Sequence, residues 1–241
     1  MKWYVYFTGC LLLLTLTSVA QKKKPVHDEM GILELHISHS QNQVPLRIGD
    51  TFQNQLGQSF TLRKLKYYLS GFSISQVAAT PSYYLVDIAD SNSCTIRLKL
   101  RAGIYNKLYG RIGIDSAANC SGAQTGVLDP VHDMFWTWNT GYIQFKIEGD
   151  AESSSAPNGK MEYHIGGYRH PFNTIQQITL QPKSQMEIRA GRTTRMVLQM
   201  ELYHFWEAAG ISFSERPVVA VPGEQAVKLA CAFKTCFQLI D

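Results

Sequence analysis

One stretch, residues 125–149, constrains the fold of this chain more than any other; it reads TGVLDPVHDMFWTWNTGYIQFKIEG. It opens with a turn at Asp129-Pro130, because proline fixes its own φ and restricts the residue before it. It ends in the alternating run Tyr142–Glu148, which predicts a strand with one buried face. Residues 131–138 are predicted to be extended as well. One face of that segment then carries an imidazole, a thioether and two indoles: His132, Met134, Trp136 and Trp138.

This face has two interpretations. Aromatic stripes usually belong to a core, so Met134, Trp136 and Trp138 would pack inside a sandwich while His132 lies at its rim. The other interpretation is chemical, because such a density of electron-rich side chains on one face is unusual. The rest of the chain helps to choose between them.

The N-terminal residues predict export. Lys2 forms a short basic region, residues 3–19 are apolar, and Ser18-Val19-Ala20 has the small residues of a cleavage site. We therefore expect a signal peptide over residues 1–20, and Cys10 would be lost with it. No later stretch approaches the about 20 apolar residues that a membrane span needs. The sequence predicts a soluble protein of the periplasm or the extracellular space.

The charge balance excludes some partners. The formal net charge is +4, but Lys2 and the run Lys22–Lys24 lie in the signal peptide or in a basic tail over residues 21–30. Without these four lysines the charge is 4 − 4 = 0. A neutral domain has no general electrostatic attraction for nucleic acid or anionic lipid. Residues 31–241 are expected to form a single domain.

Four cysteines remain after cleavage: Cys94, Cys120, Cys231 and Cys236. An even number in an exported protein suggests two disulfides, and four cysteines allow three pairings. Proximity in sequence favours Cys94–Cys120 and Cys231–Cys236. Because the chain has no C-x-x-C motif, neither a thioredoxin-like redox site nor a zinc ribbon is indicated.

Two further histidines stand out by their positions in predicted strands. In residues 30–39, His39 shares parity with the apolar positions and is expected to point inward, whereas His36 is expected to face solvent. A buried histidine must hydrogen-bond or bind a metal. His164 comes just before Gly166-Gly167, which places its imidazole at a strand end beside a tight bend.

The remaining periodicity defines the fold class. Strands are predicted within residues 60–75, 83–88, 95–100, 104–115, 174–180 and 193–205. Only residues 222–239 have helical spacing, with Pro222 in the first turn. We therefore predict an all-β, β-sandwich-like single domain with one C-terminal α-helix.

Several of these segments resemble a known family. The runs TLRKLKYYLSGFSIS, YYLVDIADSNS, YGRIGIDSAANCSGAQTGVLDPVHDMFWTWNTGYIQFKIEG and MEYHIGG are similar, in this order, to the MbnP-like exported copper-binding proteins. The resemblance covers nearly the whole mature chain. It implies a β-rich periplasmic fold and a companion diheme cytochrome of the MauG type, which oxidises a tryptophan of the copper protein to kynurenine.

The resemblance also implies site residues. His39 matches the family's histidine on the first strand, His164 matches the histidine of its Y-H-I/L-G segment, and Trp136 or Trp138 would be the oxidised residue. Imidazole and thioether are soft enough for Cu(I), so Met134 is predicted to be a weaker third donor. Zinc would require a fourth strong ligand, which these residues do not supply.

Two other classes of function stay open. Asp115, Asp129, Asp133 and His132 are near one another in sequence, and carboxylate–histidine sets perform hydrolysis in enzymes. Aspartates beside glycine and proline are ordinary turn residues, however, and no nucleophile elbow is present, so we expect no enzymatic activity. The stronger alternative is a non-metal adhesion or carbohydrate-binding sandwich, since sandwiches host many binding functions.

Overall fold

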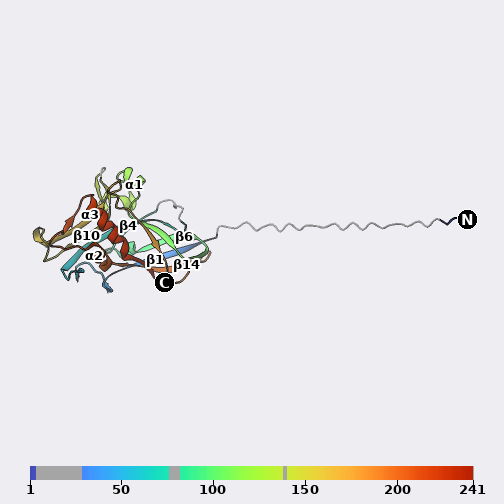
Figure 1. Ribbon diagram of the computed structural model, residues 1–241, viewed down its shortest axis with the longest axis horizontal. Helices are drawn as coiled ribbons and strands as arrows, with labels where there is room; N and C mark the ends of the chain where they lie inside the picture. The colour runs from blue at the N-terminus through green and yellow to red at the C-terminus, as the bar shows by residue number, and fades with distance from the viewer. Residues whose placement is uncertain (4–28, 76–81, 138–139, 241) are drawn as a thin grey trace.

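The computed structural model describes residues 1–3, 29–75, 82–137 and 140–240 (Figure 1). The predicted signal peptide beyond residue 3, nearly all of the basic tail, and Trp138 lie outside the described residues. The chain is mostly β, with two large sheets, and its C-terminal region carries a helix. The predicted fold class is confirmed.

The smaller of the two sheets has five strands and is organised around β1 (Met30–Gln41). Along β1, Leu33, Leu35 and Ile37 are buried while the residues between them are more exposed, as the alternation predicts. The other strands are β14 (Thr193–Glu201), parallel to β1, and the antiparallel strands β6 (Thr95–Arg101), β2 (Val44–Pro45) and β16 (Phe237–Ile240).

The larger sheet has nine strands, and two of them come from the stretch of residues 125–149. Its main path runs β12-β8-β4-β10-β11-β15, and β3, β5 and β9 pair with β4 or β10. The bounds are β3 (Thr51–Gln53), β4 (Ser59–Ser73), β5 (Tyr83–Asp87), β8 (Leu108–Ile112), β9 (Phe135–Thr137), β10 (Gly141–Asp150), β11 (Lys160–Gly166), β12 (Gln176–Leu180) and β15 (Val218–Val219). A separate two-stranded sheet joins β7 (Gly103–Tyr105) to β13 (Met186–Ile188).

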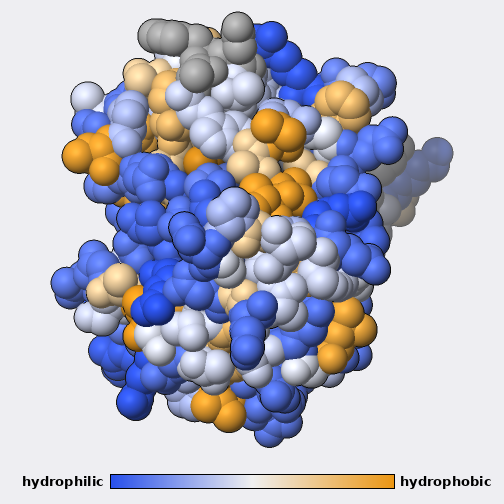
Figure 2. All heavy atoms as spheres, turned by 90° about the vertical axis from the view of Figure 1, so that its left-hand side faces the viewer, coloured by the Kyte–Doolittle hydropathy of each residue, from blue (hydrophilic) through white to orange (hydrophobic). Residues whose placement is uncertain are grey.

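The helices are short. The α-helices are α1 (Ser116–Cys120), α2 (Leu202–Ala209) and α3 (Glu224–Phe233), and the 3-10 turns are η1 (Ser91–Cys94), η2 (Gly126–Leu128), η3 (Pro130–His132), η4 (Pro157–Gly159) and η5 (Lys234–Cys236). Within the described residues, no helix is long and apolar enough to cross a membrane. Figure 2 shows that the end of the molecule opposite the N-terminus is mainly hydrophilic, with hydrophobic residues in small groups.

The main core is aromatic and lies where α2 and α3 pack on the inner face of the larger sheet. Phe145 of β10 stacks on Phe233 of α3 with ring centroids 4.0 Å apart, and Trp206 of α2 makes edge contacts with Phe60 and Phe213. Such ring pairs add about 0.5–1.5 kcal/mol each to the free energy of unfolding beyond their area. The helices therefore hold β10 and β4 firmly from the inner side.

The local structure differs from the sequence-based expectation at the two ends of this helical region. The strand expected over residues 193–205 stops at Glu201, whose carboxylate accepts a hydrogen bond from the Tyr203 amide and caps α2. Residues 202–209 bury one helical face, which the strand-like alternation before them concealed. The C-terminal helix begins at Glu224 and ends at Phe233, and residues 237–240 pair with β14 as a strand.

A second, smaller core cluster covers the outer face of the larger sheet. It contains Tyr68, Ile114, Ala118, Leu128, Met134, Tyr142 and Ile143, and we call it the outer cluster. The Tyr142 hydroxyl donates to the Leu128 carbonyl at 2.8 Å, and the Tyr68 hydroxyl donates to the Val127 carbonyl at 2.9 Å. These bonds fasten the segment before β9 onto the outer face of the sheet, which is the face that carries the candidate site.

Candidate metal centre

Strand register decides which side chains share a face of the larger sheet. His164 of β11 is paired with Lys146 of β10, and Lys146 is paired with Lys66 of β4. Their neighbours Phe145 and Ile165 point the other way, into the main core. Since successive residues alternate between faces, His164 lies on the outer face of the sheet.

His164 lies between two carboxylates. Its Nε2 donates to Oε1 of Glu148 at 2.8 Å, and its Nδ1 is 3.8 Å from Oε1 of Glu162. One ligand atom from each of the three residues lies within 4.8 Å of the others, and all three side chains are partly buried. An imidazole with two carboxylates is a donor set that fits a divalent transition-metal ion.

The electrostatics keep Glu148 ionised. The hydrogen bond from His164 lowers the pKa of Glu148 to about 2, with help from Lys64 and against the effect of burial. The Lys64 ammonium lies 3.2 Å from Oε2 of Glu148. A cation at this site would therefore compete with Lys64 for a carboxylate that is charged at neutral pH.

Lys146 anchors the neighbouring loop to the sheet. Its side chain is 2% exposed, and its Nζ lies 2.8 Å from Oδ2 of Asp133 and donates to the Asp133 carbonyl at 2.5 Å. Asp133 adopts a left-handed conformation with φ 60°. Burial opposes ionisation of its carboxylate, but hydrogen bonds from Lys146 and Lys64 lower the pKa of Asp133 below its usual range.

Trp136 lies beside this group. A Cβ built on Gly166 would be 2.7 Å from Cζ3 of Trp136, so the indole occupies the space that a side chain at position 166 would need. Gly166 is two residues beyond His164 on the same strand, and the two positions share a face. Trp136 is partly buried and packs against the outer cluster. The structure thus places Trp136 and His164 on one face.

Met134 has a different environment. It is fully buried in the outer cluster, among aromatic and aliphatic side chains. The structure gives it a packing role, as the first interpretation of this stretch suggests. Its predicted role as a third donor stays a prediction.

His39 is not brought together with His164. Its Nε2 lies 2.8 Å from the hydroxyl of Tyr67, which pairs with Phe145 and therefore points to the inner face of the larger sheet. Burial lowers the pKa of His39 to about 4, so the imidazole is neutral near pH 7. His39 of the five-stranded sheet thus lies on the inner side of the larger sheet, whereas His164 lies on the outer face of the larger sheet. The structure does not bring the two histidines together, and their joint binding of one ion stays a prediction.

Other predicted residues have structural partners. The segment 131–138 is not extended throughout, because residues 130–132 form the turn η3; His132 there lies 3.0 Å, through its Nε2, from the Gly126 carbonyl oxygen. Asp115 caps α1 and Asp129 caps η3 through their side chains. Trp138 lies outside the described residues.

The disulfide expectation is also corrected. Cys94, Cys120, Cys231 and Cys236 are all free thiols. Cys231 is exposed on α3, whereas Cys236 is buried in η5, and burial raises the pKa of its thiol well above the usual range. Proximity in sequence failed because each pair has one member in the core and one at the surface.

Sequence reasoning missed Glu148, Glu162 and Lys146. The signal was present, because Glu162 and His164 are two residues apart on one strand and Lys146 and Glu148 are two apart on its partner. What the sequence lacks is the register that sets the two pairs side by side.

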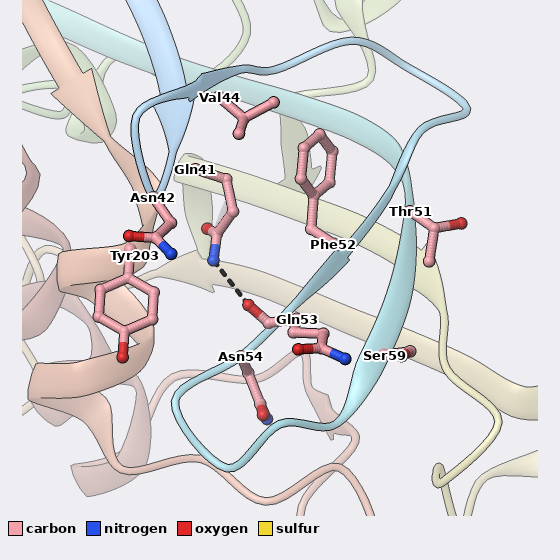
Figure 3. A pocket seen from close by; sticks show the side chains of 9 residues that line it. All are labelled: Gln41, Asn42, Val44, Thr51, Phe52, Gln53, Asn54, Ser59 and Tyr203. Atoms are coloured by element: carbon pink, nitrogen blue, oxygen red, sulfur yellow. Dashed lines mark hydrogen bonds between the residues drawn. The ribbon is translucent and has the colours of Figure 1, made fainter.

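A separate hollow of about 500 Å³ lies near the end of β1 (Figure 3). Its walls carry amide and hydroxyl side chains and two aromatic rings, and no charged side chain: Gln41, Asn42, Val44, Thr51, Phe52, Gln53, Asn54, Ser59 and Tyr203. Gln41 is 3% exposed and donates from Nε2 to the Gln53 carbonyl at 2.7 Å. Its Oε1 is buried without a hydrogen-bond partner.

The fold and the site together define a β-rich domain that carries a histidine–carboxylate group and an indole on one sheet face. The chain belongs to the MbnP family, whose model matches residues 30–222. The resemblance noted in the sequence is therefore confirmed.

Among solved structures, the chain is similar to MbnP from Methylosinus trichosporium, with a TM-score of 0.52 and 12% identity over 74% of this chain and 78% of that one. At this identity the likeness supports the fold. A comparison with curated proteins gives no match.

Proposed function

We propose that this protein is an exported copper-binding protein whose ion binds at His164 with Glu148 and Glu162. The observation that carries the proposal is the group itself, one imidazole and two carboxylates within 4.8 Å on a sheet face. Membership of the MbnP family supports the choice of copper, because the resemblance that the sequence shows is to exported copper-binding proteins. The apolar leader of residues 3–19 supports export.

The donors also bear on the oxidation state. The expectation of Cu(I) depends on two imidazoles together with the thioether of Met134. His39 lies apart from His164, and Met134 is fully buried in the outer cluster. The group around His164 offers nitrogen and oxygen, which suit Cu(II), and Cu(II) binds more tightly than other divalent first-row ions to a given site. We therefore propose Cu(II) for the unmodified protein.

Trp136 is the residue that we propose as the substrate of a companion diheme cytochrome. Its indole shares the outer face with His164 and is partly exposed, so an external oxidant can reach it. Conversion to kynurenine opens the indole and gives a carbonyl and an aniline nitrogen. Either group would add a polar contact on the face that carries the proposed ion site.

The proposed role is binding rather than catalysis. The acidic residues that could support a hydrolytic site are used in the fold: Asp115 caps the helix α1, Asp129 caps the turn η3, and Asp133 is held by Lys146 and Lys64. None of them combines with an activated nucleophile among the described residues.

Metal analysis of histidine variants tests the proposed site. The exported protein is loaded separately with Cu(I) without oxygen and with Cu(II), freed of excess metal, and analysed for bound copper. His164→Ala should lose stoichiometric copper, whereas His39→Ala and the matched surface control His36→Ala should keep it. Copper lost in His39→Ala but kept in His164→Ala would overturn the assignment.

Spectroscopy then separates the oxidation states. A Cu(II) complex should give an electron paramagnetic resonance signal with coupling to one imidazole nitrogen, and His164→Ala should abolish it. Stoichiometric Cu(I) that survives a competing chelator, together with weak Cu(II) binding, would instead support the soft-donor set expected from the sequence.

The hollow near the end of β1 favours a second candidate function, neutral saccharide binding. An uncharged wall of amides and hydroxyls with two aromatic rings suits a polyhydroxylated ligand, because C–H faces can pack on the rings while the hydroxyls hydrogen-bond. Calorimetric titration with neutral oligosaccharides tests this candidate. Asn42→Ala and Tyr203→Ala should weaken any binding, and an absence of heat with all ligands would reject it.

A further inference from the structure

The charge of the domain is unevenly placed, although its sum is near zero. On the outer face of the five-stranded sheet, register aligns Lys99 with Ile32 and Arg97 with Glu34 across β6 and β1. On the other side of β1, Arg195 is aligned with Glu34. The face therefore carries basic residues from two strands that flank β1.

The basic residues outnumber the acids that accompany them. At the Met30 end of this face, Arg97, Lys99, Arg101 and Arg195 on the strands and Arg189 and Arg192 in the adjoining turn stand against Glu29, Glu34 and Glu187, which gives 6 − 3 = +3. A further acid, Glu201, is aligned with Ser40 at the opposite end of β1. Since the whole chain without its four N-terminal lysines is neutral, the rest of the molecule is correspondingly acidic. The net charge near zero is therefore the sum of a basic face and an acidic remainder.

Three of these cations, Arg97, Arg195 and Lys99, remain available to a partner. Glu34 bonds to both Arg97 and Arg195, yet the two arginine side chains are 71% and 77% exposed. Exposed ion pairs of this kind contribute little and are easily exchanged for another anion. Lys99 is exposed and forms no ion pair with any described residue.

An apolar hollow of about 390 Å³ opens in the same face. Met30, Gly31, Ile32, Leu98 and Gly191 line it together with Arg97 and Lys99. Ile32 is 39% exposed there. A hollow with apolar walls and cations beside it matches a molecule that has an apolar chain and an anionic head.

We propose that this face docks on the surface of an anionic lipid bilayer. Charge complementarity attracts the head groups, and the hollow accepts apolar matter that a nucleic acid or a purely acidic protein does not present. The site is separate from the group around His164 and does not depend on copper.

Vesicle co-sedimentation tests the docking. The exported protein should bind vesicles of equal parts phosphatidylglycerol and phosphatidylcholine, bind pure phosphatidylcholine far more weakly, and dissociate as salt is raised. Lys99→Glu and Arg195→Glu should each reduce the partition coefficient by at least about five-fold, the loss expected for one cation near an anionic surface. Lys228→Glu on α3 makes the same charge change elsewhere and should have little effect.

A second variant tests the apolar part. Ile32→Ser should weaken binding without changing its salt dependence, and thermal unfolding of each variant confirms that it is folded. Equal binding to neutral vesicles, or an equal loss in Lys228→Glu, would overturn the proposal. So would tight binding to soluble polyanions such as heparin with none to anionic vesicles.

Discussion

The indole of Trp136 fills the place of a side chain at Gly166. A Cβ at this glycine would be 2.7 Å from Cζ3 of the indole and 2.7 Å from the carbonyl oxygen of Tyr142. One contact is with a ring and the other is with backbone, so neither can yield without movement of β10 or β9. The absence of a side chain at position 166 is therefore what lets the indole lie on the face that His164 shares.

Gly166→Ala should consequently destabilise the protein. Overpacking of a tight site costs about 1–3 kcal/mol of the free energy of unfolding, and displacement of the indole should also change the fluorescence of Trp136. Denaturant titration measures both effects. Gly223→Ala is the matched control, because a Cβ there meets nothing within 4 Å. Equal small effects at the two positions would show that the indole is not held against β11.

The contact between Lys146 and Asp133 should respond asymmetrically to substitution. Asp133→Asn leaves a buried ammonium without its close carboxylate, at a cost of about 1.5–3 kcal/mol, while the amide keeps the left-handed turn acceptable. Lys146→Met leaves an exposed Asp133 that still has Lys64 at 3.0 Å, so its cost should be smaller. Chemical denaturation of both variants and of the double variant measures the coupling. Equal costs for the single variants would contradict the asymmetry.

Titration of His39 should contribute to the loss of stability of the protein at acid pH. Its pKa in the folded state is about 4, below the value of 6.5 for a free histidine. Between pH 4 and 6.5 the imidazole is protonated in the unfolded chain but neutral in the folded protein. The free energy of unfolding should therefore fall as pH drops from 6.5 to 4. The loss is on the order of 2–3 kcal/mol.

His39→Gln should remove this part of the pH dependence, since glutamine can still hydrogen-bond to Tyr67 but does not titrate. Denaturation at a series of pH values measures it, with His36→Gln on the same strand as the control. The low pKa of Glu148 acts in a separate window, because its stabilisation is present above 4.5 and lost toward pH 2. An unchanged profile in His39→Gln would contradict the burial argument.

Thiol labelling should follow the burial of the four cysteines. Cys120 and Cys231 are exposed and should react with a maleimide in the native protein, whereas Cys94 and Cys236 should react only after unfolding. Mass spectrometry of the labelled peptides without reductant reads out each position. Unreactive cysteines in the unfolded protein would mean that disulfides exist after all.

The alternation of apolar and polar residues along single strands predicted correctly which side chains point inward. It placed His39 on the inner side of β1 and His36 on the outer side, as the structure shows. The helix over 224–233 was recognised from its spacing. Strand parity is a local property, and for that reason it could be predicted without knowledge of the partners.

The arrangement of the candidate site could not be predicted from strand parity, because it depends on strand register and on which sheet face meets the core. Whether His39 and His164 face one another is decided by which face of each sheet meets the core, and they face apart. Glu148 becomes a neighbour of His164 only through the register between β10 and β11. The turn at residues 130–132 likewise broke an alternation that would have grouped His132 with Met134.

The proposed oxidation of Trp136 gives the last prediction. The protein, produced with and without a diheme cytochrome of the MauG type, is digested and the peptides over residues 131–146 are compared by mass spectrometry. We expect kynurenine at position 136 only with the cytochrome, because the partly exposed indole lies on the outer face where an external oxidant has access. Trp136→Phe should abolish the modified peptide, and Trp206→Phe, at a fully buried indole in the main core, should leave it unchanged. Intact indoles in both samples would make Trp136 a packing residue, and modification at Trp138 alone would assign the role to its neighbour.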